Sequence, residues 1–278
     1  MVLEGDRNGW GLSFAFPLAG RIRKPRQVGL TMVLDKGLGL QATEELLDLA
    51  GEYIDYLKLS FGSSALYPHQ YLRRKVNLIK EKGISVYPGG TFFEVAIVQG
   101  KMEDYLEKAL ELGFQVIEIS DGTIELPATL RSRAIKEAKS RGFEVLTEIG
   151  KKDKAAPFPL VKMIQLGEQD LENGADRVII EARESGKGVS IYNGEGEMDK
   201  FMVEQLLSGL GSENIIWEAP LKKQQVEFIK IFGPNVNLGN IAVTEVLALE
   251  SLRVGLRGDT FKETLKDNKD AQFYIEVR

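Results

Sequence analysis

The feature that most constrains the fold of this chain is an alternation of short apolar runs with longer amphipathic segments, repeated eight times. The apolar runs are rich in Val, Ile and Leu, which is typical of strands buried on both faces of a parallel sheet. We expect strands at 29–34, 53–60, 84–88, 114–120, 144–149, 177–182, 214–219 and 235–238. We expect helices at 41–51, 67–82, within 92–112, and at 128–140, 160–173, 198–210, 221–232 and 243–254.

Eight strand–helix units in strict alternation favour a (β/α)8 TIM barrel, because right-handed crossovers place such strands in parallel. The competing arrangement is an open doubly wound sheet, in which a G-x-G-x-x-G fingerprint would follow the first strand. Residues 35–40 do not supply that fingerprint. We therefore predict a single-domain barrel at 28–254. An N-terminal extension, 1–27, would cover one end of the core, and a polar C-terminal tail, 255–278, would lie on the surface or at a subunit contact.

Composition excludes several classes of function. The net charge of −5 argues against nucleic acid as a partner, since there is no basic excess to neutralise phosphates. The chain has no cysteine, which excludes disulfides, thiolate nucleophiles and cysteine-bound metals, and which fits a cytoplasmic protein. No segment approaches the roughly 18 apolar residues of a membrane span, so we expect no membrane partner. The only histidine, His69, lies between a strand and a helix and is interpreted as a surface residue.

Four of the predicted strands carry a glutamate near the carboxyl end, at Glu118, Glu148, Glu181 and Glu218. The carboxyl ends of barrel strands meet at one rim, so these residues should converge. A carboxylate at the end of a buried strand is costly unless a cation or a metal accompanies it. A structural ion pair would explain one such glutamate, but four in matching register favour a functional ring. Spacing alone does not settle which of them bind metal.

Cations and amides accompany the glutamates at the same predicted rim. They are Lys36, Lys58, Lys151, Lys152, Arg183, Asn237 and Asn240. Residues Gly89, Gly90 and Thr91 follow the third strand and form either a tight turn or a contact to a phosphate or carboxylate. The glycine-rich run 184–197 suits a mobile lid, and equally an ordinary loop.

Eight short motifs can be compared with those of known families. They are Leu34–Gly37, Val86–Thr91, Glu118–Gly122, Leu146–Lys152, Ile180–Gly188, Glu218–Pro220, Val236–Ile241 and Arg253–Thr260. In these motifs the chain resembles the phosphosulfolactate synthase family. The matches span residues 29 to about 261 and touch seven of the eight predicted strand ends. Ile149 and Gly239 stand where a valine and often an alanine would be expected. The resemblance implies a TIM barrel that adds sulfite to phosphoenolpyruvate with Mg²⁺, giving (2R)-phospho-3-sulfolactate.

The chemistry of that reaction suits the rim residues. Attack of sulfite on the methylene carbon creates an enediolate-like dianion, which a carboxylate-bound divalent metal would stabilise. We predict that the Mg²⁺ ligands lie among Glu118, Glu148, Glu181 and Glu218. The predicted contacts to the small anionic substrates are Lys36, Lys58, Gly90, Thr91, Arg183, Asn237 and Asn240.

Protonation of the intermediate calls for a lysine of tuned pKa. We expect Lys152 to be the proton donor, because it shares the parity of Glu148 along the strand, with Lys151 as the alternative. Glu148 completes the predicted catalytic set. A second hypothesis is a non-catalytic barrel resembling the plant heat-stress-associated proteins. Loss of rim charges would favour it, and here they are all present. The sequence leaves a homo-oligomer open.

Overall fold

The computed structural model describes residue 10, residues 15–151 and residues 158–267 of the chain. Within these residues the strands form one parallel eight-stranded sheet. The strands are β1 Thr31–Asp35, β2 Tyr56–Leu59, β3 Ser85–Pro88, β4 Val116–Ile119, β5 Glu144–Ile149, β6 Arg177–Ile180, β7 Ile215–Glu218 and β8 Leu238–Ala242. The predicted TIM barrel is confirmed.

The barrel is closed by hydrogen-bonded ladders along every strand junction except one. The order of paired strands is β3-β2-β1-β8-β7-β6-β5-β4, so that β3 and β4 are the two ends of the sheet. These two strands also lie in contact. The Gly90 amide, just after β3, donates a 2.7 Å hydrogen bond to the Glu118 side chain on β4. A side chain therefore joins the two strands where the backbone ladder does not.

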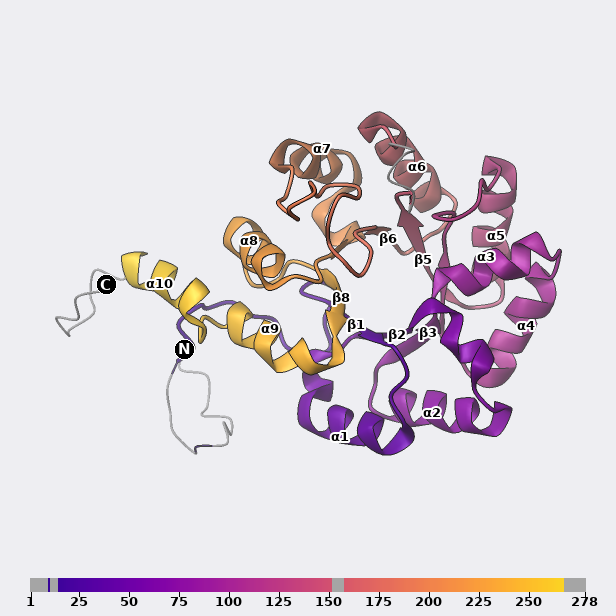
Figure 1. The fold of residues 1–278 in the computed structure, drawn as a ribbon, viewed down its shortest axis with the longest axis horizontal. Helices are drawn as coiled ribbons and strands as arrows, with labels where there is room; N and C mark the ends of the chain where they lie inside the picture. Colours follow the sequence, from indigo (N-terminus) through magenta and orange to yellow (C-terminus); the bar gives the residue numbers. More distant parts are fainter. Residues whose placement is uncertain (1–9, 11–14, 152–157, 268–278) are drawn as a thin grey trace.

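Helices surround the barrel (Figure 1). They are α1 Leu40–Ala50, α2 His69–Glu81, α3 Gly90–Val98, α4 Met102–Leu112, α5 Ala128–Ser140, α6 Leu160–Glu172, α7 Lys200–Leu210, α8 Lys222–Phe232, α9 Val246–Arg253 and α10 Gly258–Asp267. The segment expected to be helical within 92–112 is two helices, because the chain turns at Gly100 with a left-handed φ of 66°. None of the helices in the described ranges is long and apolar enough to cross a membrane.

Two apolar layers follow from the alternation of side chains along each strand. One set fills the barrel interior, with Met32, Tyr87, Leu146 and Ile179 among its members. The other set faces the surrounding helices and forms the larger core. Charged side chains lie at both ends of the barrel interior. Glu144 and Arg177 lie at the amino end, and Lys58 and Glu118 lie at the carboxyl end.

Segments at both ends of the described chain pack against the barrel. Before β1, Arg21 pairs with Glu250 of α9 at 2.9 Å, and Arg26 pairs with Asp55 at 2.8 Å. After α9, the predicted polar tail forms α10, whose buried Thr260 donates a hydrogen bond to the Leu252 carbonyl. Asp259 of α10 pairs with Lys222 of α8 at 3.1 Å.

The last strand lies further along the chain than we predicted. We expected it at 235–238, whereas β8 is Leu238–Ala242. Asn237 therefore precedes the strand and lies at the amino end of the barrel, where its side chain accepts from the Leu30 amide and donates to the Ile215 carbonyl. The prediction that Asn237 belongs to the carboxyl rim is wrong, because the predicted strand ends at 238, where the strand in the structure begins.

Candidate active site

The ammonium group of Lys58 lies among three glutamates at the carboxyl end of the barrel interior. Its Nζ atom is 2.8 Å from Glu118 Oε2, 3.1 Å from Glu148 Oε2 and 3.8 Å from Glu218 Oε1. All four residues are buried, Lys58 being 8% exposed. We call these four residues the Lys58 cluster. It brings together three of the predicted metal ligands and one lysine predicted to bind substrate.

Backbone amides hold two of the carboxylates in place. Glu118 accepts a hydrogen bond from the Gly90 amide, and Glu218 accepts one of 2.8 Å from the Ala182 amide. A Cβ atom at Gly90 would lie 2.4 Å from Ser120 Oγ and 2.6 Å from Glu118 Oε1. The glycine is therefore required for the close approach of the two strand ends. The predicted contact of Gly90 to substrate stays a prediction, and its amide already serves Glu118.

Burial and mutual charge shift the pKa values of the Lys58 cluster. Burial raises the pKa of Glu218 to about 7, with Lys58 opposing and Glu148 adding to the shift. Burial likewise raises the pKa of Glu118 against the opposing charge of Lys58. Burial by itself lowers the pKa of Lys58, but Glu118 and Glu148 outweigh it and the pKa is raised well above its ordinary value. The ammonium form of Lys58 is therefore the stable one.

The ends of β1 and β8 form a second part of the rim. A cavity of about 330 Å³ there is lined by Leu34, Lys36, Gly37, Leu38, Ala242 and Val243. Buried Asp35 orders the loop that carries Lys36, since it accepts from the Gly37 and Leu38 amides at 2.7 Å and pairs with Lys75. The exposed Lys36 ammonium forms an ion pair with Glu184, on the connection after β6. The sequence alone does not pair Glu184 with Lys36, because the two residues are 148 positions apart.

A bulge in β8 directs Asn240 toward the same region. Thr31 pairs with Leu238 and Val33 pairs with Ile241, so β8 has one residue more than β1 over this stretch. Asn240, within the bulge, has a left-handed φ of 55° and donates a hydrogen bond to the Arg183 carbonyl at 3.3 Å. Bulges commonly redirect side chains beside active sites. Asn240 and Arg183 thus lie together, as expected for residues of one rim.

Lys151 points toward the connection after β4. Its ammonium donates to the Asp121 carbonyl at 2.8 Å, to Asp121 Oδ2 at 3.0 Å and to the Ile124 carbonyl at 3.0 Å. Lys152, the preferred candidate for the proton donor, lies outside the described residues. The roles predicted for both lysines stay predictions.

The glycine-rich run after β6 is anchored at several points. The Gln224 side chain of α8 donates to the Gly186 carbonyl at 2.8 Å and to the Gly196 carbonyl at 3.2 Å. The Tyr192 hydroxyl donates to the Glu218 carbonyl at 2.8 Å. Of the two alternatives, lid and ordinary loop, these contacts favour a fixed loop. They also tie it to a residue of the Lys58 cluster.

The described side chains do not form a metal site from protein ligands alone. Within the part of the chain that the structure describes, no group of three or more acidic or histidine side chains is arranged to hold an ion. Three of the predicted ligands instead surround Lys58, and Glu181 accepts from the Arg183 amide. The oxygen donors do suit Mg²⁺, which often takes only one or two carboxylates and completes its shell with water and substrate oxygens. The arrangement therefore fits an ion shared between protein and substrate.

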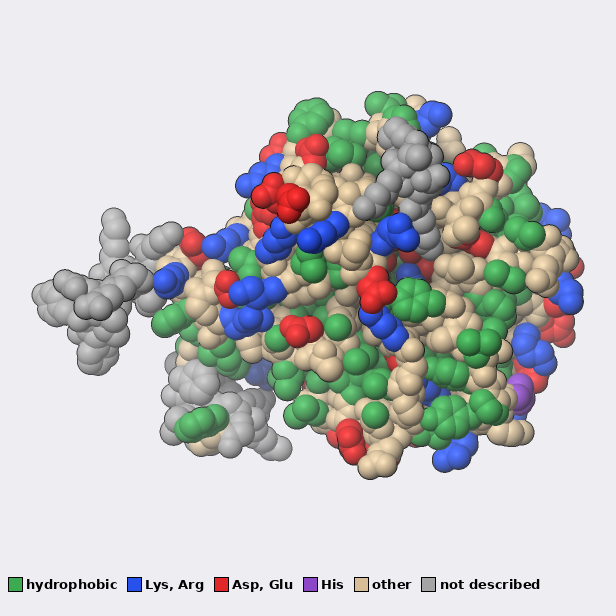
Figure 2. All heavy atoms as spheres, in the orientation of Figure 1, with side chains coloured by type: hydrophobic (Ala, Val, Ile, Leu, Met, Phe, Trp, Pro, Cys, Tyr) green, Lys and Arg blue, Asp and Glu red, His purple; other side chains and the backbone are tan. Residues whose placement is uncertain are grey.

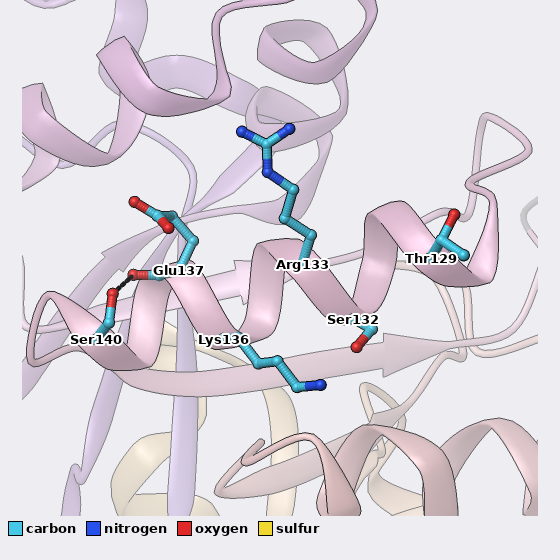
Figure 3. A pocket seen from close by; sticks show the side chains of 6 residues that line it. All are labelled: Thr129, Ser132, Arg133, Lys136, Glu137 and Ser140. Carbon is cyan, nitrogen blue, oxygen red and sulfur yellow. Dashed lines mark hydrogen bonds between the residues drawn. The ribbon is translucent and has the colours of Figure 1, made fainter.

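The outer surface offers a larger depression, of about 490 Å³, along α5 (Figure 3). It is lined by Thr129, Ser132, Arg133, Lys136, Glu137 and Ser140. All six come from one helix on the outside of the barrel, and Arg133 pairs there with the exposed Glu103. None of the rim residues reaches it. We therefore assign the candidate active site to the rim.

Comparisons with known proteins identify the family to which the chain belongs. The model of the (2R)-phospho-3-sulfolactate synthase (ComA) family matches residues 19–259. The phosphosulfolactate synthase of Methanocaldococcus jannaschii is 48% identical over 237 residues, which cover 84% of this chain and 94% of that protein. Protein HEAT-STRESS-ASSOCIATED 32 of Arabidopsis thaliana is 26% identical, covering 84% of this chain and 88% of that protein.

Among solved structures, the YdjI aldolase from Escherichia coli K12 superposes with a TM-score of 0.52 at 12% identity, covering 87% of this chain and 91% of that one. At that identity the likeness shows the barrel fold alone. The family match shows more than the fold, because it covers most of the chain and includes every strand of the barrel. The resemblance stated from the motifs is confirmed, and the chain belongs to the (2R)-phospho-3-sulfolactate synthase family of enzymes.

Proposed function

We propose that the protein catalyses the addition of sulfite to phosphoenolpyruvate, giving (2R)-phospho-3-sulfolactate with Mg²⁺ as cofactor. The observation that carries the proposal is the Lys58 cluster, in which three buried carboxylates share one ammonium group at the carboxyl rim. Such a cluster has an excess of negative charge that a bound cation would balance. The family membership of the chain supports the same reaction.

The surface around the rim suits substrates with several negative charges. Figure 2 shows Lys and Arg side chains gathered over the region where Figure 1 places α8 and the connection after β6. Lys187, Lys222 and Lys223 are exposed there. Phosphoenolpyruvate and sulfite are both anions, so a basic rim would favour their approach. We assign the phosphate or carboxylate of phosphoenolpyruvate to the cavity beside Lys36, and we propose that Asn240 and Arg183 contact the substrate as well.

The reaction forms one carbon–sulfur bond and adds one proton. The sulfur lone pair of sulfite attacks the methylene carbon, and the π electrons move toward the adjacent carboxylate to give an enediolate-like dianion. A proton then adds to the carbon that bears the phosphate ester. Lys58 supplies fixed positive charge at the centre of the rim, where the Glu118 and Glu148 carboxylates hold it. Preorganised charge of this kind requires no rearrangement during the reaction.

We propose Lys152 as the donor of that proton, with Lys151 as the alternative. Lys152→Ala should reduce kcat far more than it raises KM for phosphoenolpyruvate, because proton transfer belongs to the transition state. Lys151→Ala tests the alternative donor in the same way, and the variant with the larger fall in kcat identifies the donor. If Lys152→Ala converts phosphoenolpyruvate at the wild-type rate in single-turnover kinetics, another group donates the proton.

Mg²⁺ would be held by carboxylates from the set Glu118, Glu148, Glu181 and Glu218 together with substrate oxygens. When bound, it supplies positive charge that stabilises the developing dianion. Addition of a chelator should abolish turnover, and excess Mg²⁺ should restore it. Full activity in excess chelator would remove the metal from the proposal.

The decisive experiment mixes the purified protein, Mg²⁺, phosphoenolpyruvate and sulfite and follows the products by ³¹P and ¹³C NMR. The expected result is a phosphate ester whose C3 carbon is bonded to sulfur. Omission of sulfite is the control, and phosphoenolpyruvate should then persist. If both substrates remain while circular dichroism shows a folded protein, the proposed reaction is wrong.

A further inference from the structure

Arg131 is a buried arginine on the face of α5 that packs against the barrel. The residue is 2% exposed. Its Nε donates to Asp170 Oδ1 at 2.8 Å and its Nη2 to Asp170 Oδ2 at 2.6 Å, which is a bidentate pair between α5 and α6. Such a pair would be complete as a structural link between two helices. Arg131 makes two further contacts, and both lead toward the rim.

The first of these contacts reaches the backbone of a residue in the Lys58 cluster. Arg131 Nη2 donates to the Glu148 carbonyl at 3.2 Å. Glu148 is the next-to-last residue of β5, and its side chain accepts from Lys58. A carbonyl at this point in a barrel strand fixes the backbone from which the side chain projects. Arg131 therefore holds the position of Glu148 from outside the barrel.

The second contact reaches Lys151 through Asp121. Arg131 Nη1 lies 3.4 Å from Asp121 Oδ1, while Asp121 Oδ2 accepts from the Lys151 ammonium at 3.0 Å. One carboxylate thus joins the guanidinium to the lysine. Glu148, which Arg131 contacts directly, and Lys151, which it reaches through Asp121, lie on either side of Gly150, where β5 ends.

We propose that Arg131 is a positioning residue for the reaction, which sets the location of Glu148 and of Lys151 through its planar guanidinium. Asp170 orients that guanidinium in turn. The inference rests on the proposed function, since it assigns Arg131 to the geometry of that same site. Lysine cannot replace this arginine, because an ammonium group lacks the rigid fork that serves Asp170, Asp121 and a carbonyl together.

The test compares Arg131→Lys with Arg26→Lys. Arg26 is a matched control, because it also forms a buried bidentate pair, with Asp55, but does so before β2 at the amino end of the barrel. Loss of an outer positioning contact in metal sites commonly lowers activity by about 10- to 100-fold. We expect a kcat loss of that size in Arg131→Lys with KM for phosphoenolpyruvate nearly unchanged, and a change below about threefold in Arg26→Lys. Equal losses in both variants would overturn the proposal.

A second readout needs no turnover. Lys151, whose side chain is 12% exposed, should be acylated slowly by an amine-reactive ester in the wild type and faster in Arg131→Lys, as measured by peptide mass spectrometry against exposed Lys82. An unchanged ratio of the two rates would contradict the positioning role. If Arg131→Lys raises the rate of Lys151 acylation while the wild type has no synthase activity, the proposed function is wrong and Arg131 still sets the position of Lys151.

Should Arg131→Lys fail to fold, Asp170→Asn tests the same inference, because it keeps the guanidinium and removes the charge that orients it. We expect the same fall in kcat and the same gain in Lys151 acylation. Wild-type values for both quantities in a folded Asp170→Asn protein would overturn the proposal.

Discussion

Two glutamates on one strand show how the two ends of the barrel differ. Glu144 and Glu148 stand four residues apart on β5, at its amino and carboxyl ends. Glu144 accepts from the Tyr56 hydroxyl and pairs with Arg177 at 3.2 Å. Glu148 instead shares the Lys58 ammonium with Glu118 and Glu218. Around Glu144, one cation therefore serves one carboxylate, whereas in the Lys58 cluster one cation serves three.

If only the stability of the fold mattered, each buried carboxylate would be expected to pair with one cation. The amino end follows that rule elsewhere too, in the pairs Arg26–Asp55 and Arg21–Glu250. An excess of buried carboxylate costs free energy, because each charge loses its hydration. At the carboxyl end the folded protein accepts this cost and holds the groups with backbone amides. The difference supports the proposal that the Lys58 cluster takes part in the reaction.

The largest expected effect comes from removing the shared cation. Lys58→Met leaves three buried carboxylates without an ammonium group. Breaking a buried ion pair in this way costs about 3–5 kcal/mol of folding free energy. Turnover should fall by about 10³-fold, the upper range for loss of a principal electrostatic group. Urea unfolding and steady-state kinetics at saturating phosphoenolpyruvate measure the two effects.

Arg177→Met is the control at the amino end. It removes the cation beside Glu144, which keeps the Tyr56 hydrogen bond and partial access to water. We expect a smaller loss of stability than in Lys58→Met. The change in kcat should stay below about threefold, because Arg177 lies at the end of the barrel opposite the candidate active site. If Arg177→Met lowers kcat as much as Lys58→Met does, the two ends are not functionally distinct.

The second prediction uses the two glutamates themselves. Glu148→Gln should lower turnover by about 10²-fold, because a neutral amide cannot hold Lys58 or a metal ion as a carboxylate does. Glu144→Gln, on the same strand and the same inward face, should leave turnover nearly unchanged. Both variants keep the side-chain size, so kcat at equal folded fraction gives the comparison directly. Similar kcat values in the two variants would contradict the assignment of the site to one end.

Much of this contrast was predictable from the sequence. Alternating strands and helices predict the barrel, and the barrel predicts that Glu118, Glu148 and Glu218 meet at one rim. Their common partner was not predictable, because the stagger between strands decides which cation lies among them. Lys58 lies buried between carboxylates, and its predicted contact to substrate stays a prediction. Asn237 was misplaced because its strand begins later than its apolar pattern suggests.

Arg131 and Asp170 were missed although the sequence carries a signal for them. Arg131 lies in register with Ile135 and Ala138 on the buried face of α5, and Asp170 with Met163 and Gly167 on that of α6. A charged residue within the apolar stripe of a helix indicates a buried ion pair. Which helix supplies the partner depends on the packing of neighbouring helices, and a single sequence does not give it.

The third prediction concerns two asparagines that the sequence placed together. Asn237→Ala removes a partner from the Leu30 amide and the Ile215 carbonyl and should cost about 1–3 kcal/mol of stability with kcat unchanged. Asn240→Gly tolerates the left-handed backbone but loses the contact to Arg183, so kcat/KM should fall with little loss of stability. Urea unfolding and initial rates separate the two. A loss of kcat in Asn237→Ala but not in Asn240→Gly would contradict the assignment of the active site to the carboxyl end of the barrel.

The smallest expected effect is a pH dependence at the amino end. Burial raises the pKa of Glu144 above the ordinary 4.5, with the Tyr56 hydrogen bond and Arg177 opposing the shift. Between 4.5 and the raised value, folded Glu144 holds a proton that the unfolded chain has released, so stability falls as pH rises. This contribution is fully present below 4.5 and is lost as pH passes through the raised pKa. Glu144→Gln removes it, so the difference in unfolding free energy between wild type and variant should shrink across that window. A difference that stays constant with pH in urea titrations would mean that Glu144 titrates as an ordinary surface carboxyl.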